Sequence, residues 1–265
     1  GKAETYIELA HKAGFRFNFL FNAIVTEGRE FEPQVWAALR AKLQWLADLR
    51  VEWVTVANQP LLERIKKNFP NFKVSTSVNS EINEVNRVVD YDWAGADRIA
   101  VDYLVGRNFR IIKAMRAATR KPLELLVNEP CLVHCTNRLY HQATFCRGSR
   151  EGESFLVPDI AQIFCGIRRL EDFCSVLKAN WYRPDDIKYL IESGVNVIKL
   201  AGRMQPTDWI LKSAQAYATM RFDDGNIYSL IEKQGMYSKE YLSYLDTEDH
   251  VKLRPFRFVI DNKRL

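Results

Sequence analysis

Strand-like runs alternate with helix-like runs along most of the chain, and this alternation restricts the fold more than any other feature of the sequence. Six runs carry β-branched and aromatic residues on both faces, which is typical of parallel strands covered by helices. They are Arg16–Ala23, Glu52–Ala57, Lys73–Val78, Arg98–Asp102, Leu123–Asn128 and Asn196–Ala201. Repeated strand–helix units favour either a doubly wound parallel sheet or a (β/α)₈ barrel.

The helix-like runs place apolar residues at helical spacing on one face. They are Thr5–Ala13, Gln34–Leu49, Leu61–Phe69, Glu81–Trp93, Phe109–Ala118 and Pro206–Met220. No strand precedes the first run, and the strands found are too few for a closed barrel of eight. We therefore expect an incomplete barrel that lacks an N-terminal strand–helix unit, with one further strand in Pro255–Ile260.

Polar residues stand at or just past the carboxyl ends of the predicted strands. They are Asn22, Asn58, Asn79, Asp102, Asn128 with Glu129, and Arg203. A barrel collects its active site at this rim from many strands, whereas an open sheet concentrates it at one switch point. Turn formation explains part of the pattern. We predict one TIM-type (β/α) barrel domain over residues 1–265, with Asn58, Asp102 and Asn128 binding substrate.

Composition and charge exclude several classes of protein. A chain with 47% hydrophobic and 27% charged residues is typical of folded proteins, and no apolar run reaches the ~20 residues of a membrane-spanning helix. Without a secretory signal pattern, the chain is expected to be cytoplasmic. The net charge of +5 is interspersed, so it permits nucleic-acid binding but does not indicate it. Dinucleotide and P-loop motifs are absent from the sequence.

All five cysteines lie between Cys131 and Cys174, with the spacing C-x3-C-x10-C-x18-C-x8-C. A disulfide framework is not expected in a cytosolic protein of this size. Four thiolates at a strand end can hold zinc or an iron–sulfur cluster, and the long, uneven gaps fit a cluster better than a zinc knuckle. Spacing alone is equally compatible with reduced structural cysteines. We predict that residues 129–180 form a cysteine-containing insertion on the barrel rim.

The sequence resembles peptidase family U32, the collagenase-like peptidases. The motifs that carry the resemblance follow in family order along almost the whole chain. They are Thr55–Asn58; Leu126–Cys131 with Cys135, Arg138 and His141; Trp181–Asp186; Lys199–Arg203 followed by Pro206–Trp209; and Asp224–Asn226. Family members resemble TIM-type barrels with a four-cysteine [4Fe–4S] cluster. Several of them act with partners in oxygen-independent hydroxylation of quinone precursors or RNA bases.

This resemblance implies a [4Fe–4S] cluster held by Cys131, Cys135, Cys146 and Cys165. Cys131 and Cys135 stand in the family-like Asn-Glu-Pro-Cys context, and Cys165 precedes the Arg-Pro-Asp motif at a family-like distance. Cys146 is preferred to Cys174 as the fourth ligand because it lies within the same excursion above the rim. Cys174 falls in an apolar helical pattern, so we expect it in the core.

The predicted catalytic residues beside the cluster are Arg138, His141, Arg183 and Arg203. The guanidinium groups of the three arginines can hold an anionic or phenolic small-molecule substrate. A peptidase is the first alternative, with Cys146 and His141 as nucleophile and base, although Gly-x-Ser-x-Gly and His-Glu-x-x-His motifs are absent from the sequence. The second alternative is a non-catalytic cluster-bearing scaffold. Either a paralogous subunit or a second copy of the chain is an expected partner.

Overall fold

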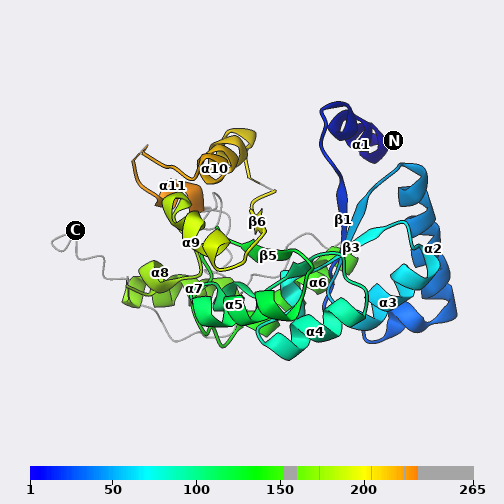
Figure 1. Cartoon of the computed structure of the whole chain (residues 1–265), viewed down its shortest axis with the longest axis horizontal. Helices are drawn as coiled ribbons and strands as arrows, with labels where there is room; N and C mark the ends of the chain where they lie inside the picture. The colour runs from blue at the N-terminus through cyan, green and yellow to red at the C-terminus, as the bar shows by residue number, and fades with distance from the viewer. Residues whose placement is uncertain (152–159, 173, 204, 224, 232–265) are drawn as a thin grey trace, which may run out of the picture.

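The computed structural model describes residues 1–151, 160–172, 174–203, 205–223 and 225–231. Each of the six strands lies inside a predicted run, so these predictions are confirmed. The strands are β1 (Asn18–Phe21), β2 (Trp53–Val56), β3 (Lys73–Thr76), β4 (Ile99–Ala100), β5 (Leu123–Leu126) and β6 (Val197–Lys199). Figure 1 shows them flanked by helices along the chain.

Helices follow the strands, with short 3-10 turns between some of them. The α-helices are α1 (Lys2–Lys12), α2 (Pro33–Asp48), α3 (Gln59–Asn68), α4 (Val85–Trp93), α5 (Phe109–Ala118), α6 (Arg138–Glu151), α7 (Ile160–Glu171), α8 (Cys174–Lys178), α9 (Ile187–Glu192), α10 (Thr207–Thr219) and α11 (Tyr228–Ile231). The 3-10 turns are η1 (Arg29–Phe31), η2 (Val78–Ser80), η3 (Tyr103–Val105) and η4 (Pro184–Asp186).

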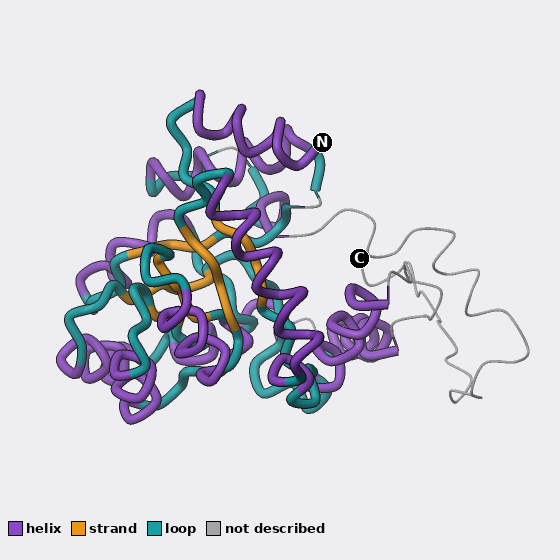
Figure 2. The backbone as a smooth tube through the Cα atoms, turned by 90° about the vertical axis from the view of Figure 1, so that its right-hand side faces the viewer, coloured by secondary structure: helices purple, strands orange, loops and turns teal. Residues whose placement is uncertain are grey.

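The strands pair in parallel and in chain order. One sheet has the order β1-β2-β3 and the other β4-β5-β6, and a parallel bridge between Ser75 and Arg98 connects the two. Figure 2 shows the strands at the centre of the helices. This sequential parallel order is that of a (β/α) barrel. Within the described ranges β6 does not pair with β1, so the predicted α/β class is confirmed while barrel closure is not observed.

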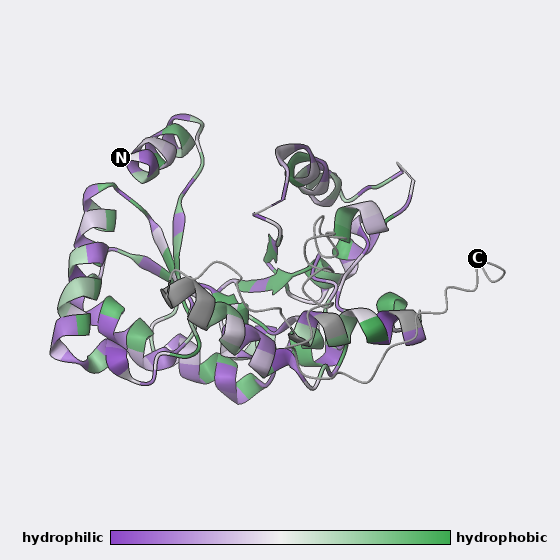
Figure 3. Ribbon diagram, turned by 180° about the vertical axis from the view of Figure 1, so that it is seen from behind, coloured by the Kyte–Doolittle hydropathy of each residue, from purple (hydrophilic) through white to green (hydrophobic). Residues whose placement is uncertain are grey.

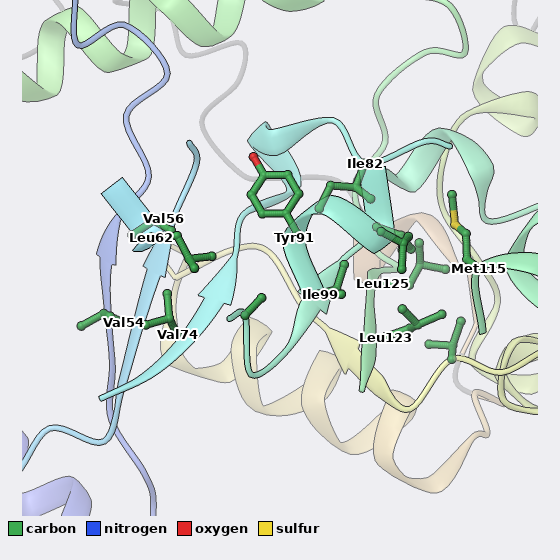
Figure 4. Packing of buried hydrophobic residues seen from close by; sticks show 14 of the residues in the cluster. Val54, Val56, Leu62, Val74, Ile82, Tyr91, Ile99, Met115, Leu123 and Leu125 are labelled. Atoms are coloured by element: carbon green, nitrogen blue, oxygen red, sulfur yellow. The ribbon is translucent and has the colours of Figure 1, made fainter. Parts of the chain in front are cut away.

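Side chains alternate between the two faces of each strand, and only one face is apolar throughout. Val54, Val74, Ile99 and Leu123 are fully buried on the face that is covered by helices. Figure 4 shows them packed with side chains from α3, α4 and α5, and Figure 3 shows the alternation of hydrophobic and hydrophilic residues along the helices. This layer between strands and helices is the main hydrophobic core.

The opposite strand face carries charge. Glu124 of β5 is buried and forms ion pairs with Arg98 Nε at 2.9 Å and with Lys199 Nζ at 3.2 Å. The Arg98 guanidinium also donates to Ser75 Oγ at 3.2 Å and lies 4.4 Å from the Trp53 ring centroid. A buried carboxylate between two cations satisfies the requirement that buried charge be paired. We call Arg98, Glu124 and Lys199 the lumen network.

The structure corrects two local predictions and leaves one outside its range. Glu81 adopts a left-handed conformation with φ of 50° after η2, so α4 begins at Val85 instead of Glu81. Cys174 is exposed, and not in the core, because the apolar pattern is divided between α7 and α8 and Cys174 is the first residue of α8. The predicted strand Pro255–Ile260 lies outside the described residues. No helix in the described ranges is both long enough and apolar enough to cross a membrane.

Candidate functional site

The end of β4 places a buried carboxylate against the first residue of α6. Asp102 accepts the Leu104 N–H with one oxygen at 2.9 Å, and its other oxygen lies 2.7 Å from Arg138 Nη1. The Arg138 guanidinium also lies 4.5 Å from the Tyr103 ring centroid, with Nε 3.7 Å from a Glu81 oxygen. Burial lowers the pKa of Arg138, but the hydrogen bond to Asp102 and the neighbouring charges outweigh it, so the pKa is raised overall. Arg138 therefore stays charged at this rim.

The end of β5 brings a thiol and a second carboxylate to the same place. Cys131 Sγ lies 3.7 Å from Glu129 Oε1. Tyr103 is buried, and burial raises the pKa of its hydroxyl; Cys131 and Glu129 raise it further, whereas Arg138 lowers it. Tyr103 thus stays protonated and can donate a hydrogen bond. We call Asp102, Tyr103, Glu129, Cys131 and Arg138 the rim site.

Two further cysteines lie beside the rim site. Cys135 and Cys165 pack against a small cluster that contains Leu132 and Trp181. Burial raises the pKa of the Cys165 thiol, the charge of Cys135 adds to this, and Arg169 opposes it. Arg169 also donates to the Pro130 carbonyl, which ties α7 to the loop after β5. Cys131, Cys135 and Cys165 are therefore held on the β5 side of the rim.

Cys146 lies in a different place. Its Sγ accepts the backbone N–H of Ile24, in the loop after β1, at 3.3 Å. Across the part of the chain that the structure describes, no three His, Cys, Asp or Glu side chains are grouped closely enough to hold a metal ion. The four cysteines predicted as cluster ligands are thus not brought together in this arrangement, and the residues as placed do not form a finished metal centre.

The predicted substrate-binding residues all make intramolecular contacts. Asn58 caps α3 by accepting the Leu61 N–H at 2.8 Å, and its amide also donates to Glu30. The Asn128 side chain accepts the Ala201 N–H at 2.7 Å and donates to the Ala201 carbonyl at 3.0 Å, which joins the ends of β5 and β6. Asp102, the third, pairs with Arg138. Capping and cross-strand bonding are the direct structural roles of these residues.

Arg138 is the predicted catalytic residue that reaches the rim site. His141 lies one turn further along α6 and its ring packs against Phe145 at a tilt of 37°, with ring centroids 4.7 Å apart. Arg183 is exposed beside η4 and pairs with Asp185 at 2.9 Å, and Arg203 is exposed in the loop after β6. The predicted set is therefore distributed over the rim instead of forming one cluster.

Sequence reasoning missed two buried polar residues at the rim. Tyr103 directly follows the strand-end residue Asp102, so its position in the sequence already indicated that it lies at the rim. Glu30, in the loop between β1 and α2, is buried and accepts hydrogen bonds from Thr26 at 2.9 Å and Asn58 at 3.3 Å. No motif marks Glu30, because its burial depends on how that loop folds over the end of β2.

Comparison with known proteins agrees with this architecture. No protein-family model matches the sequence. The chain is 26% identical over 243 residues to an uncharacterized protease of Methanocaldococcus jannaschii, MJ1657, in a match that covers 91% of this chain and 70% of the relative. The solved structure of the U32 peptidase Mk0906 matches with a TM-score of 0.61 at 21% identity, over 77% of this chain and 76% of that one. The chain is thus similar in sequence to an uncharacterized protease and in fold to a U32 peptidase.

The sequence match to MJ1657 spans the rim residues as well as the strands and helices, because it covers nearly the whole chain. At 21% identity, the match to Mk0906 speaks for the shared fold alone. A parallel strand–helix fold with its polar rim at the carboxyl ends of the strands is where enzymes of this architecture bind and convert substrates. The rim site is thus the candidate for chemistry.

Proposed function

We propose that the chain is an iron–sulfur protein of the U32 family that takes part in oxygen-independent hydroxylation, or a related modification, of a small aromatic molecule or an RNA base. It would act either alone, as a homodimer, or beside a paralogous subunit. The observation that carries the proposal is the position of Cys131, Cys135 and Cys165 on the same side of the rim as Arg138 and Tyr103. Soft thiolate ligands favour iron–sulfur clusters and zinc over harder metals.

The thiols must move closer together for a cluster to bind. Within the described ranges no three candidate ligands are grouped for a metal ion. Cys131 lies in the loop after β5 and Cys165 lies in α7, which the Arg169 bond to Pro130 already connects. Metal binding commonly completes the folding of its own site, because a preformed site is rare without the metal.

The rim site offers hydrogen-bond donors for an anionic or phenolic substrate. Arg138 uses Nη1 for Asp102, while its buried Nη2 has no hydrogen-bond partner in the described part of the chain. A substrate oxygen at Nη2 would satisfy a donor that is otherwise costly to bury. The Tyr103 hydroxyl is held neutral beside it and can donate as well. These two residues would therefore bind and orient the substrate.

The first prediction concerns the metal content of the wild-type chain. We expect anaerobically purified protein to contain about four irons and labile sulfide per chain, with broad absorption near ~400 nm. Metal analysis and the absorption spectrum measure this directly. Cys135→Ser should lower the iron content, whereas Cys174→Ser, at the exposed end of α8, is the matched control that should retain it. Zinc in place of iron, or no bound metal at all, would reject the proposal.

A peptidase is the second candidate, because both matched proteins carry that description. In the structure, Cys146 Sγ accepts the Ile24 N–H, and the His141 ring packs against Phe145. A cysteine nucleophile needs a positioned base that raises its thiolate fraction. Hydrolysis of a peptide mixture by metal-free protein, abolished by Cys146→Ser, would favour the peptidase over the iron–sulfur function.

A further inference from the structure

The helix α6 separates Cys146 from the cysteines near β5. Cys135 lies just before α6, where its carbonyl accepts the Arg138 N–H at 3.2 Å. Cys146 lies eight positions beyond Arg138 in the same helix. A helix rises about 1.5 Å per residue, so this is a separation of ~12 Å along the helix axis. Metal–thiolate bonds are only ~2.3 Å long, so ligands of one centre must converge within a far smaller volume.

Cys131 and Cys146 are each held in place by hydrogen bonds to a different part of the rim. The Cys131 carbonyl accepts two hydrogen bonds from Asn180, through the backbone N–H at 3.0 Å and the side-chain amide at 2.9 Å, which holds the loop after β5 next to Trp181. At the other end, Cys146 accepts the Ile24 N–H beyond β1. Bringing Cys146 to the other thiols would break this bond and unwind part of α6.

We infer that Cys146 anchors α6 to the loop after β1 and is not a ligand of the centre that Cys131, Cys135 and Cys165 would form. The ligand half of this inference rests on the proposed function, whereas the anchor half does not. With Arg138 held by Asp102 at the end of β4 and Cys146 held by Ile24 beyond β1, α6 is a strap fixed at two separated points of the rim. The strap positions Arg138 beside Tyr103.

Amide hydrogen exchange tests the anchor without reference to any metal. In Cys146→Ala the Ile24 amide loses its acceptor, so it should exchange several-fold faster than in wild type. Cys146→Ser retains an acceptor oxygen and should keep exchange at Ile24 close to the wild-type rate. Equal exchange at Ile24 in wild type and Cys146→Ala would overturn the anchor, provided that exchange elsewhere in α6 shows both chains folded.

Thiol alkylation of the full wild-type chain, followed by mass spectrometry, tests the ligand half. Iron bound by thiolates should protect Cys131, Cys135 and Cys165 from iodoacetamide by at least about tenfold relative to chelator-treated protein. Cys146 should react at the same rate in both samples, and Cys146→Ser should keep the wild-type iron content. Iron-dependent protection of Cys146, or loss of iron in Cys146→Ser to the level of Cys135→Ser, would overturn the inference. If the wild-type chain holds no iron, the proposed function fails, and the exchange rate at Ile24 still decides the anchor.

Discussion

Replacing Glu124 with glutamine is expected to lower the free energy of unfolding by about 3 kcal/mol, because it leaves the two cations of the lumen network without their anion. Glu124 is 3% exposed, and the side chains of Arg98 and Lys199 are 18% and 28% exposed. Both cations keep some access to water. The expected loss of unfolding free energy therefore lies at the lower end of the range for breaking a buried ion pair. Urea denaturation of both chains measures it.

A surface carboxylate supplies the matched control for this experiment. Glu63 in α3 is exposed and accepts a hydrogen bond from Gln59 at 2.9 Å, so Glu63→Gln should change the unfolding free energy by no more than about 0.5 kcal/mol. Combining Glu124→Gln with Lys199→Met should cost less than the sum of the single changes, because one of the unpaired cations is then gone. A Glu124→Gln effect no larger than that of Glu63→Gln would contradict the lumen network.

The strands were predictable because their apolar face is continuous and their turns are marked by polar residues. The ion pairs of the lumen network could not be predicted, although the charged residues themselves are visible in the sequence. Arg98, Glu124 and Lys199 are far apart along the chain. Arg98 and Glu124 lie in runs that also contain fully buried apolar residues, whereas Lys199 lies in β6, whose residues are half-buried. Only the parallel register places Glu124 within reach of both cations.

Polar residues at strand ends identified the rim but not the role of each side chain. Asn58 and Asn128 are predicted to bind substrate, and this stays a prediction. The structure shows that Asn58 caps α3 and that Asn128 joins the ends of β5 and β6. An amide that caps a helix and an amide that binds substrate look the same in a sequence. Only the folded structure distinguishes them, because it shows whether a backbone N–H lies within hydrogen-bonding distance of the side-chain oxygen.

Cysteine spacing was similarly incomplete as a guide. The predicted excursion above the rim contains a rigid helix, and α6 carries Cys146 away from Cys135 although only ten residues separate them. A flexible loop of that length could fold back and bring its two ends together, whereas a helix holds its ends apart. The exposed position of Cys174 has a similar origin, because α7 ends at Glu171 and Cys174 begins the separate helix α8.

Asp102→Asn is expected to destabilise the folded chain by about 3–5 kcal/mol, because it removes the anion beside a buried guanidinium. Asp102 is fully buried and the Arg138 side chain is 12% exposed, with Nη1 2.7 Å from the carboxylate. Asparagine keeps the oxygen that accepts the Leu104 N–H, so the change removes the negative charge while this hydrogen bond is retained. Glu81, 3.7 Å from Nε, is then the remaining anion at this guanidinium.

A double-mutant cycle separates the ion pair from the packing of its members. Arg138→Met retains much of the apolar stem over Tyr103 while removing the charge, so Asp102→Asn should cost far less in that background than in wild type. Denaturation of the four chains gives the coupling energy, and purely additive effects would contradict the pair. Because Arg138 is the first residue of α6, loss of the pair should also speed amide exchange along α6 before the core strands open. Exchange that rises equally in α6 and in β2 would instead indicate global unfolding, with no separate role for the strap.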